Sequence, residues 1–367
     1  MTRRGRGRLV GGLVLTGSTI AAAAEPTPAP LGYVCGRVAT PVVVDGVIDD
    51  PSWASAPWSA DFQDIEGGKK PAPRHRTRVK LLWDAEFLYI AAELTEPHVW
   101  GKLTEHDAVI FQDNDFEVFL DPDGDNHKYF ELEINALNTE WDLYLPKPYR
   151  DGSQADNGWE IPGLKKAIKI QGTLNDPSDT DTGWTVELAI PWEALTPNAG
   201  MPTPPRDGDQ WRINFSRVEW DTTVENGKYV KVPKQPEHNW VWSPQGVIDM
   251  HRPERWGYLQ FSTEAPGKAT YQADQDGPLR DKLMLVYQAQ TAFFKANGRW
   301  AASLEELNLK PADLQLLQAA APTIRLTPGG YEATMAYFPR DLYPWVDWKV
   351  DQDSRVTKSR RPQKPPG

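Results

Sequence analysis

The sequence of 367 residues is poor in the residue types that form disulfides and metal sites. Cys35 is the only cysteine, so no disulfide can form within the chain and the fold must be stabilised by its core. None of the six histidines follows the HExxH or His-x-His spacing of a zinc site. A nucleophile elbow, a P-loop and a dinucleotide-binding glycine motif are also missing. The usual sequence signatures of zinc enzymes, serine hydrolases and nucleotide-binding proteins are therefore absent.

Long hydrophobic runs are also missing, apart from a short one at the N-terminus. Four arginines between Arg3 and Arg8 precede an apolar, small-residue stretch from Leu9 to Ala24. About 16 residues are too few for a span, which takes about 20. We therefore interpret residues 1–24 as a secretory signal peptide, with a retained anchor as the alternative. The protein is expected to be secreted or periplasmic, with no membrane span after cleavage.

Positive charge is scarce in the rest of the chain. The full sequence has 40 Lys and Arg against 51 Asp and Glu, which gives a net charge of −11. Removing residues 1–24 takes away four arginines and no acid, so the mature chain would carry −15. This charge argues against nucleic acid or an anionic membrane as a partner. It suits a neutral ligand or a divalent cation.

Tryptophan, in contrast, is abundant. Thirteen of the 16 tryptophans lie between Trp53 and Trp256, in a part of the chain that reads as one strand after another. Exposed indole rings can stack on sugar rings, but most of these side chains must form the core. The changes in composition along the chain predict six segments: signal peptide 1–24, leader 25–39, β-domain 40–262, linker 263–277, small α+β domain 278–350 and disordered tail 351–367.

The β-domain shows the two-residue alternation of half-buried strands. Its clearest hairpin has the apolar residues Phe116, Val118 and Leu120 on one strand, and a turn follows before the return strand 128–135. The acidic residues alternate with these apolar ones and should share the opposite face. Short strands at regular spacing, without a βαβ rhythm, predict a mainly β fold, an antiparallel β-sandwich.

Several ordered motifs in this domain resemble a family 9 carbohydrate-binding module. They lie at 44–53, 82–90, 113–121, 184–192 and 255–257, so the resemblance covers about residues 40–262. The resemblance implies a DOMON-like, jelly-roll type β-sandwich that binds sugars. It also implies frequent association with glycan-degrading enzymes in carbohydrate catabolism, and calcium as a structural ion.

The acidic hairpin is the first candidate site. We expect Asp115 and Glu117 to lie beside Glu131 and Glu133 of the partner strand, and like charges side by side on a sheet repel each other. Water, a cation or the hydroxyl groups of a ligand could relieve this repulsion. A hydrolase acting on O-glycosyl compounds is the enzymatic alternative, with Glu117 and Glu133 as its two carboxylates. A non-catalytic envelope interaction module is the third possibility.

The ligand-binding candidates combine tryptophans in polar contexts with polar side chains that could bond to sugar hydroxyls. Arg217 could instead form an ion pair with Glu117 or Glu133, and each tryptophan could merely fill a loop. Other tryptophans, in strand or motif contexts, are predicted to be core: Trp53, Trp83, Trp184, Trp192 and Trp211. The predicted ligand-binding residues are Trp100, Glu117, Glu133, Asn135, Trp141, Arg217, Trp220 and Trp242.

The turn of the acidic hairpin is a candidate calcium site. Asp121, Asp123 and Asp125 imitate the start of an EF-hand loop, but Asn126 replaces its glycine and Leu132 its final glutamate. A calcium of another geometry and a plain hairpin turn remain as alternatives. No other cofactor is predicted.

The C-terminal part changes to helical spacing. Apolar residues predict a helix over 278–296, ended by Asn297-Gly298. Ser303 and Glu306 form a capping box for a short helix, and a third helix is expected over 312–320. Strands are expected over 323–327, 331–338 and 345–350. This arrangement is similar to the globular part of a type IV pilin-like protein, and it predicts packing on the sandwich or binding of an envelope protein partner.

Overall fold

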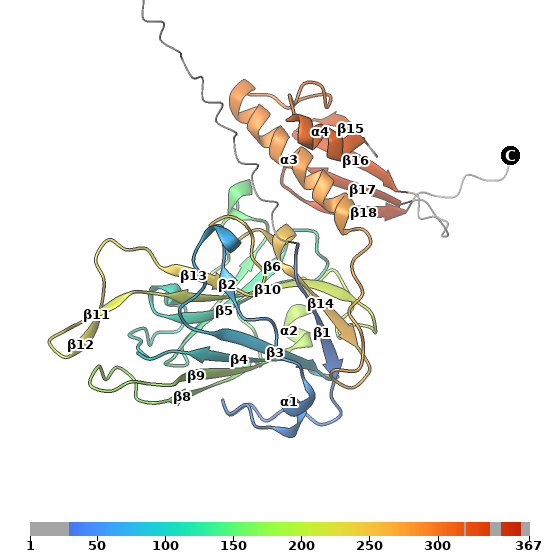
Figure 1. The fold of residues 1–367 in the computed structure, drawn as a ribbon. Helices are drawn as coiled ribbons and strands as arrows, with labels where there is room; N and C mark the ends of the chain where they lie inside the picture. The colour runs from blue at the N-terminus through green and yellow to red at the C-terminus, as the bar shows by residue number, and fades with distance from the viewer. Residues whose placement is uncertain (1–28, 319–320, 338–345, 361–367) are drawn as a thin grey trace, which may run out of the picture.

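The computed structural model describes residues 29–318, 321–337 and 346–360 (Figure 1). The predicted signal peptide lies outside these ranges. A helix with both the length and the hydropathy of a transmembrane span does not occur within them. The chain forms a large β-domain followed by a smaller helix-and-sheet domain.

The large domain is built on one 12-stranded sheet, whose main path has the order β7-β6-β5-β10-β14-β1-β3-β4-β9-β8. The remaining two strands of this sheet are β13, which pairs with β10, and the short β2, which pairs with β13. Strands β11 and β12 form a separate hairpin. The strands are β1 (Gly32–Arg37), β2 (Gln63–Asp64), β3 (Thr77–Trp83), β4 (Phe87–Thr95), β5 (Asp115–Asp121), β6 (Tyr129–Asn135), β7 (Glu140–Leu145), β8 (Lys165–Gln171), β9 (Gly183–Pro191), β10 (Gln210–Glu219), β11 (Thr222–Glu225), β12 (Lys228–Lys231), β13 (His238–Val241) and β14 (Gly257–Ser262).

The sheet curls so that its two halves enclose the main hydrophobic core. Val118 of β5 and Leu132 of β6 contribute from one half, and Ile90 of β4 and Leu188 of β9 from the other. The predicted β-sandwich class is confirmed, with one departure: β1 runs parallel to both of its neighbours, β14 and β3. The five tryptophans predicted to be core are all buried, namely Trp53, Trp83, Trp184, Trp192 and Trp211.

Helices are few and short in this domain. They are α1 (Pro51–Ser55), α2 (Trp192–Leu195) and the 3₁₀ turns η1 (Gly67–Lys69), η2 (Ile110–Gln112), η3 (Tyr149–Asp151) and η4 (Pro253–Arg255). Two of these turns, η2 and η3, lie next to the acidic strands and carry Phe111 and Tyr149. They bring aromatic side chains to the outer face of β5 and β6.

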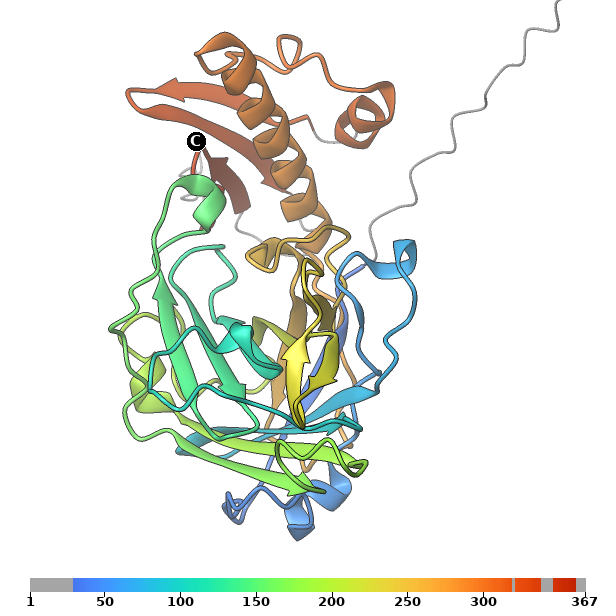
Figure 2. The same ribbon diagram turned by 90° about the vertical axis from the view of Figure 1, so that its left-hand side faces the viewer.

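The C-terminal domain packs a long helix on a four-stranded antiparallel sheet (Figure 2). The predicted first helix is confirmed, and it ends at Gly298 in the left-handed conformation. Leu283 and Val286 of this helix pack against Trp348 and Val350 of the sheet. The elements are α3 (Gly277–Asn297), α4 (Pro311–Gln318), β15 (Thr323–Thr327), β16 (Gly330–Tyr337), β17 (Val346–Asp351) and β18 (Val356–Arg360).

Two expectations for this domain are wrong. Residues 303–306 form turns rather than a capped helix. Residues 356–360, assigned to the disordered tail, form strand β18, which pairs with β17. This strand is polar in sequence. Val356 is buried, with 3% exposure, whereas residues 357–359 are exposed, so the sequence shows no alternation of apolar and polar residues that would predict a strand. Residues 319–320, 338 and 345, at the ends of predicted elements, lie outside the described residues.

The two domains contact each other through the turn between β5 and β6. The Asp125 carboxylate forms an ion pair with Arg355 at 2.9 Å. The Asn126 side chain donates a hydrogen bond to the carbonyl of Ser354 at 2.9 Å, and the Val356 amide donates to the carbonyl of Asp125. The acidic turn is therefore part of the interface between the domains.

Candidate functional site

The acidic side chains of β5 and β6 share the outer face of the sheet, as the alternation predicts. Glu117 pairs directly with Glu133, and Phe119 pairs with Glu131. These acids are not solvated: the exposed fractions are 5% for Glu117, 4% for Glu131 and 2% for Glu133. A simple solvated face is thus excluded for this hairpin.

The 3₁₀ turns η2 and η3, together with β13 and the loops around it, leave a cavity of about 210 Å³ above the acids. No lysine or arginine occurs among the described residues that line it, so the charged groups in its wall are all acidic. Three kinds of group line the cavity, namely carboxyls, aromatic rings and a few other polar or apolar groups. The lining consists of Phe111, Glu117, Phe119, Glu131, Glu133, Trp141, Leu143, Tyr149, Val218, Glu237, Asn239, Met250 and His251. We call this cavity the acidic pocket.

Burial controls the protonation of the acidic pocket. It raises the pKa of Glu117 to about 7. Burial, followed by repulsion from Glu117, raises the pKa of Glu131 and of Glu133 well above the ordinary value. Several of these carboxyls therefore hold protons near neutral pH, and a protonated carboxyl can both donate and accept a hydrogen bond.

Some polar atoms of the acidic pocket have no partner within the described structure. They include Oε2 of Glu131 and Nε1 of Trp141. A buried polar atom without a partner is costly unless water or a ligand satisfies it. The pocket therefore offers a hydrogen-bond acceptor and a donor to a bound molecule.

Aromatic rings form one wall of the acidic pocket. The Trp141 ring stacks near Phe111, with centroids 6.3 Å apart and an interplanar angle of 28°. Tyr149 is 43% exposed, and its ring lies nearly perpendicular to that of His251, with the ring centroids 4.5 Å apart. Flat apolar rings beside hydrogen-bonding groups are what a sugar ring requires of a site.

Three of the predicted ligand-binding residues lie in or beside this pocket. Glu117, Glu133 and Trp141 line it directly. Asn135 is next to the acids in the sheet, but it is fully buried. Its side-chain nitrogen donates to the carbonyl of Leu103 and to Asp113, and its oxygen accepts from two backbone amides. Asn135 is therefore committed to the fold, and the prediction that it contacts a ligand needs correction.

Arg217 is also placed differently from the prediction. It pairs in register with Phe116, so it points to the inner face of the sheet, away from Glu117. Its guanidinium donates to Glu96 at 2.6 Å and to Glu219 at 2.8 Å, and the residue is 1% exposed. Both expectations for Arg217, a sugar contact and a pair with Glu117 or Glu133, are wrong. The register between β10 and β5 places its side chain on the inner face of the sheet, opposite to the face that carries Glu117 and Glu133.

Two predicted tryptophan platforms are buried. Trp242 is 2% exposed and lies against Phe215, in space that Gly257 leaves free by lacking a side chain. Trp242 therefore offers no open face to a sugar. Trp100 is 1% exposed, but it lines a small cavity together with Glu96, His98 and Trp220. Trp220 is half-buried, and the Lys231 ammonium covers its ring at 3.4 Å.

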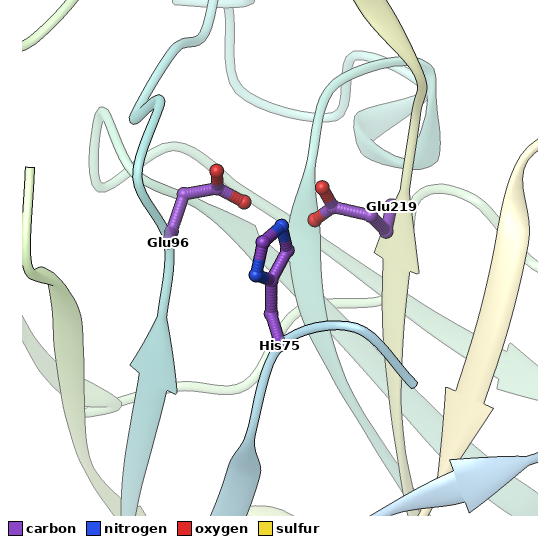
Figure 3. A group of neighbouring side chains, drawn as sticks. All are labelled: His75, Glu96 and Glu219. Carbon is purple, nitrogen blue, oxygen red and sulfur yellow. The ribbon is translucent and has the colours of Figure 1, made fainter. Parts of the chain in front are cut away.

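A second cavity, of about 160 Å³, lies at the other side of β10. Figure 3 shows His75 between the carboxylates of Glu96 and Glu219, and one ligand atom of each lies within 4.8 Å of the others. This grouping resembles a metal site. Arg217 already bridges the two carboxylates, however, and Arg74 binds Glu219 at 3.0 Å. The two guanidinium groups neutralise these acids, so the cluster does not require a metal.

The predicted calcium turn is also largely satisfied by the protein itself. The Asp121 carboxylate accepts the backbone amides of Gly124 and Asn126, and Asp123 accepts the amide of Asp125. Asp125 in addition holds Arg355. Calcium takes six to eight oxygen ligands, whereas this turn offers three carboxylates, one of them paired with a cation. The turn fits calcium poorly and fits its role in the domain interface well.

The sequence analysis missed several residues of the acidic pocket. Phe111 and Tyr149 come from the 3₁₀ turns η2 and η3, and Glu237, Asn239 and His251 from β13 and the loops around it. These segments lie far apart in the chain and follow no periodic pattern. Only the pairing of β10 with both β5 and β13 brings them together.

Known proteins similar to this chain are polysaccharide-degrading enzymes and carbohydrate-binding modules. The chain is 27% identical over 158 residues to endo-1,4-β-xylanase A of Thermoanaerobacterium saccharolyticum, which covers 43% of this chain and 11% of that enzyme. It is 26% identical over 117 residues to exoglucanase XynX of Acetivibrio thermocellus, which covers 32% of this chain and 9% of that enzyme. The chain thus spans about a tenth of the length of these curated relatives.

A similar solved structure is the family 9 carbohydrate-binding module from Caldicellulosiruptor kristjanssonii in complex with cellotriose. It has a TM-score of 0.43 and 16% sequence identity, and the match covers 66% of this chain and all of that one. Residues 44–240, more than half of the chain, match the family described as carbohydrate family 9 binding domain-like. The protein therefore belongs to the carbohydrate family 9 binding domain-like family.

Proposed function

We propose that this protein binds carbohydrate and holds one sugar ring in the acidic pocket. The observation that carries this proposal is the combination, in one small cavity, of an aromatic wall with carboxyls that have unused hydrogen-bonding atoms. Sugar hydroxyls are both donors and acceptors, so they match protonated and ionised carboxyls alike. Family membership supports the same class of ligand.

The size of the acidic pocket favours a single ring. Sites for drug-sized ligands measure roughly 300–1,000 Å³, whereas this cavity has about 210 Å³. We propose that the pocket grips one sugar unit, at the end of a glycan or free. In this arrangement Trp141 and Tyr149 contact the ring faces, and Glu131, Glu237 and Asn239 bond to hydroxyls.

Hydrolysis is the rival function, and the geometry of the glutamates disfavours it. Glycosidases hold their two carboxyls about 5 to 10 Å apart on either side of the scissile bond. Glu117 and Glu133 are direct neighbours on one face, with oxygens less than 4.8 Å apart. The pair leaves no room for a sugar between its members. Incubation with xylotriose and cellotriose should accordingly release no smaller sugar.

Export to the periplasm or the medium is part of the proposal. The basic start and the short apolar stretch of residues 1–24 support it. Expression of the full chain in a bacterial host, followed by mass spectrometry of the product, should find a mature protein that begins near Glu25. A product that retains residues 1–24 in the cytoplasm would contradict export.

Calorimetry on the mature chain tests sugar binding at this site. Glucose, xylotriose and cellotriose are suitable first probes, because the curated relatives are named as a xylanase and an exoglucanase. Trp141→Ala should weaken binding by roughly 1–3 kcal/mol if the ring stacks on the sugar. Trp220→Ala is the matched control, because that half-buried ring lies outside the acidic pocket.

The outcomes separate the three functional classes. Binding lost in Trp141→Ala and kept in Trp220→Ala supports the proposed site. Binding lost only in Trp220→Ala would move the site to the second cavity. If a glycan array and all three probes show no binding, the protein is an interaction module instead, and pull-down with residues 278–350 intact in the full chain would then identify a protein partner.

A further inference from the structure

We propose that a third cavity, between the two domains, binds the carboxylate group of a small organic acid, with Arg212 as the residue that holds its charge. The cavity has a volume of about 170 Å³. Strands β10 and β14 line it from the β-domain, and α3, β17 and β18 line it from the C-terminal domain. We call it the interdomain pocket, and its walls include Asp123, Arg212, Tyr258, Arg280, Trp348 and Lys358.

Arg212 is a buried cation without a counter-charge. It is 4% exposed, and its one hydrogen bond within the described structure runs from Nη1 to the Trp256 carbonyl at 2.7 Å. The described residues offer it no ion pair, whereas Arg217 on the same strand contacts two glutamates. The Arg212 guanidinium lies over the Tyr258 ring, with Cζ 3.8 Å from the ring centroid. A guanidinium has five N–H donors in its plane, so contact with a ring face leaves most of them for a ligand.

A second arginine approaches the same place from the C-terminal domain. A Cβ at Gly124, in the turn between β5 and β6, would lie 3.4 Å from Arg280 Nη1 and 3.5 Å from Arg212 Cγ. The two guanidinium groups also share the Tyr258 ring, because Arg280 Cζ lies 5.8 Å from its centroid. Two like charges at such a separation repel each other, and an anion beside both relieves the repulsion.

The other charges of the interdomain pocket leave one buried positive charge uncompensated. Arg280 and Lys358 each pair with an aspartate of the same wall. Arg212 and Asp123 remain, and they form no ion pair with each other within the described structure. Asp123 is exposed to solvent, which screens its charge, whereas Arg212 is buried. A singly charged carboxylate matches this balance better than a doubly charged phosphate.

Buried donors beside the two arginines also lack an acceptor. Arg280 Nε and Trp348 Nε1 have no hydrogen-bond partner within the described structure. Trp348 is 7% exposed, and Arg280 Cζ lies 5.2 Å from the centroid of its ring. A buried N–H group without an acceptor is costly. An ionised carboxylate offers only acceptors, on two oxygens, so it would supply what these donors and Arg212 lack.

This site is independent of the proposed sugar site. The interdomain pocket shares no lining residue with the acidic pocket. Arg280, Trp348 and Lys358 also lie beyond residues 44–240, which match the family. The carboxylate could belong to a free small acid or to an acidic sugar, since both present the same group to Arg212.

Calorimetric titration of sodium acetate and of D-glucuronate into the mature chain at pH 7.5, where both acids are ionised, tests the inference. The wild type should bind at least one of them. Acetate binding would show that the bare carboxylate suffices, and glucuronate binding alone would identify an acidic sugar as the ligand. Arg212→Met should weaken the binding by about tenfold or more, because a charge-assisted pair is lost.

Two further variants accompany this measurement. Trp348→Phe keeps an aromatic ring and removes one N–H donor, so it should weaken the binding by about threefold to tenfold. Arg299→Met removes an exposed arginine of the C-terminal domain, outside the interdomain pocket. It is the matched control and should bind as the wild type does. Near-UV circular dichroism checks that every variant is folded.

Three results would overturn the inference. They are no binding of either acid by the wild type, wild-type affinity in both Arg212→Met and Trp348→Phe, or loss of binding in Trp141→Ala with Arg212→Met unchanged. The last result would place the acid in the acidic pocket. If an acid binds through Arg212 and no neutral sugar binds anywhere, the interdomain site stands and the proposed function fails. If neutral sugars bind through Trp141 and neither acid binds, the reverse holds.

Discussion

Glu117 on β5 and Glu133 on β6 lie directly opposite each other in the register of the sheet, and both are buried. Two ionised carboxylates in such a pair would repel each other, and burial together with this repulsion raises the pKa of Glu133 well above its ordinary value. The pair is nonetheless held in place, by the Phe111 amide on Glu133 and by the aromatic cover above. An energetically unfavourable pair at the floor of a pocket is typical of a functional site rather than of a stabilising contact.

Glu133→Gln tests this view of the pair. The amide oxygen can still accept the Phe111 amide, while a carboxyl whose pKa is raised by burial and by Glu117 gives way to a group that does not titrate. Because the folded pKa of Glu133 lies above its unfolded value, the wild type loses stability as the pH rises above about 4.3, the ordinary glutamate pKa, and Glu133→Gln removes this loss. The free energy of unfolding should therefore rise by about 1 kcal/mol or more on substitution at pH 7.5, relative to the effect of the substitution at pH 4. Urea denaturation followed by tryptophan fluorescence measures both values, and an equal effect at the two pH values would contradict this prediction.

Arg217 should be essential for stability and irrelevant to the sugar. Arg217→Met would leave Glu96 and Glu219 buried without their shared cation, and breaking a buried pair in this way costs about 3–5 kcal/mol. Adding Glu96→Gln to this variant should recover part of the loss, since burial already raises the pKa of Glu96 to about 8. Urea denaturation provides the measurement. A loss below about 1 kcal/mol would mean that Arg217 does not hold these carboxylates.

The ion pair between Asp125 and Arg355 should hold the C-terminal domain on the sandwich. In Arg355→Ala, we expect faster hydrogen exchange in β18, with a small stability loss of about 1 kcal/mol because the arginine is partly exposed. Arg325→Ala removes an exposed pair with Glu332 inside the C-terminal domain and is the control. Equal exchange in the two variants would show that the turn does not dock this domain.

His251 should make the fold sensitive to acid. Burial lowers its pKa to about 4, and Nδ1 lies 3.0 Å from the Tyr129 hydroxyl. The unfolded chain, with a histidine pKa of about 6.5, takes up the proton first as the pH falls. The stability present above pH 6.5 is therefore lost between pH 6.5 and 4, by up to about 3 kcal/mol.

His251→Gln should flatten this part of the stability profile, because glutamine does not titrate. Thermal unfolding from pH 7 to pH 4 gives the comparison. Asp249 and Arg150 act on the same histidine and remain in both proteins. Profiles that stay parallel over the whole range would show that another group causes the acid sensitivity.

Local sequence patterns predicted the β5–β6 hairpin and the long helix α3 of this protein. Alternation between Phe116 and Glu117 assigned the hairpin faces, and the apolar spacing from Leu279 to Phe294 assigned the long helix. Both features are set within a few residues of the chain, so the sequence alone contains them. Ordered motifs then indicated the family.

Side-chain placement that depends on distant strands was not predictable in this way. Arg217 faces the interior because β10 pairs with β5 in a register that no local pattern reveals. Trp242 has polar neighbours in the sequence and belongs to the hydrophobic core in space. Phe111 and Tyr149 reach the acidic pocket from irregular turns, whose course is decided by packing.

The most direct test of the account observes the tryptophan indole N–H groups while sugar is added. Trp141 lines the acidic pocket and its Nε1 has no partner in the described structure, whereas Trp220 Nε1 donates a hydrogen bond to the Phe111 carbonyl. In ¹⁵N-labelled protein titrated with cellotriose, with the resonance assigned through Trp141→Phe, we predict a saturable shift of the Trp141 indole signal. The signals of the buried Trp100 and Trp242 should stay in place. A saturable shift at another tryptophan, with Trp141 unchanged, would contradict the acidic pocket as the sugar site.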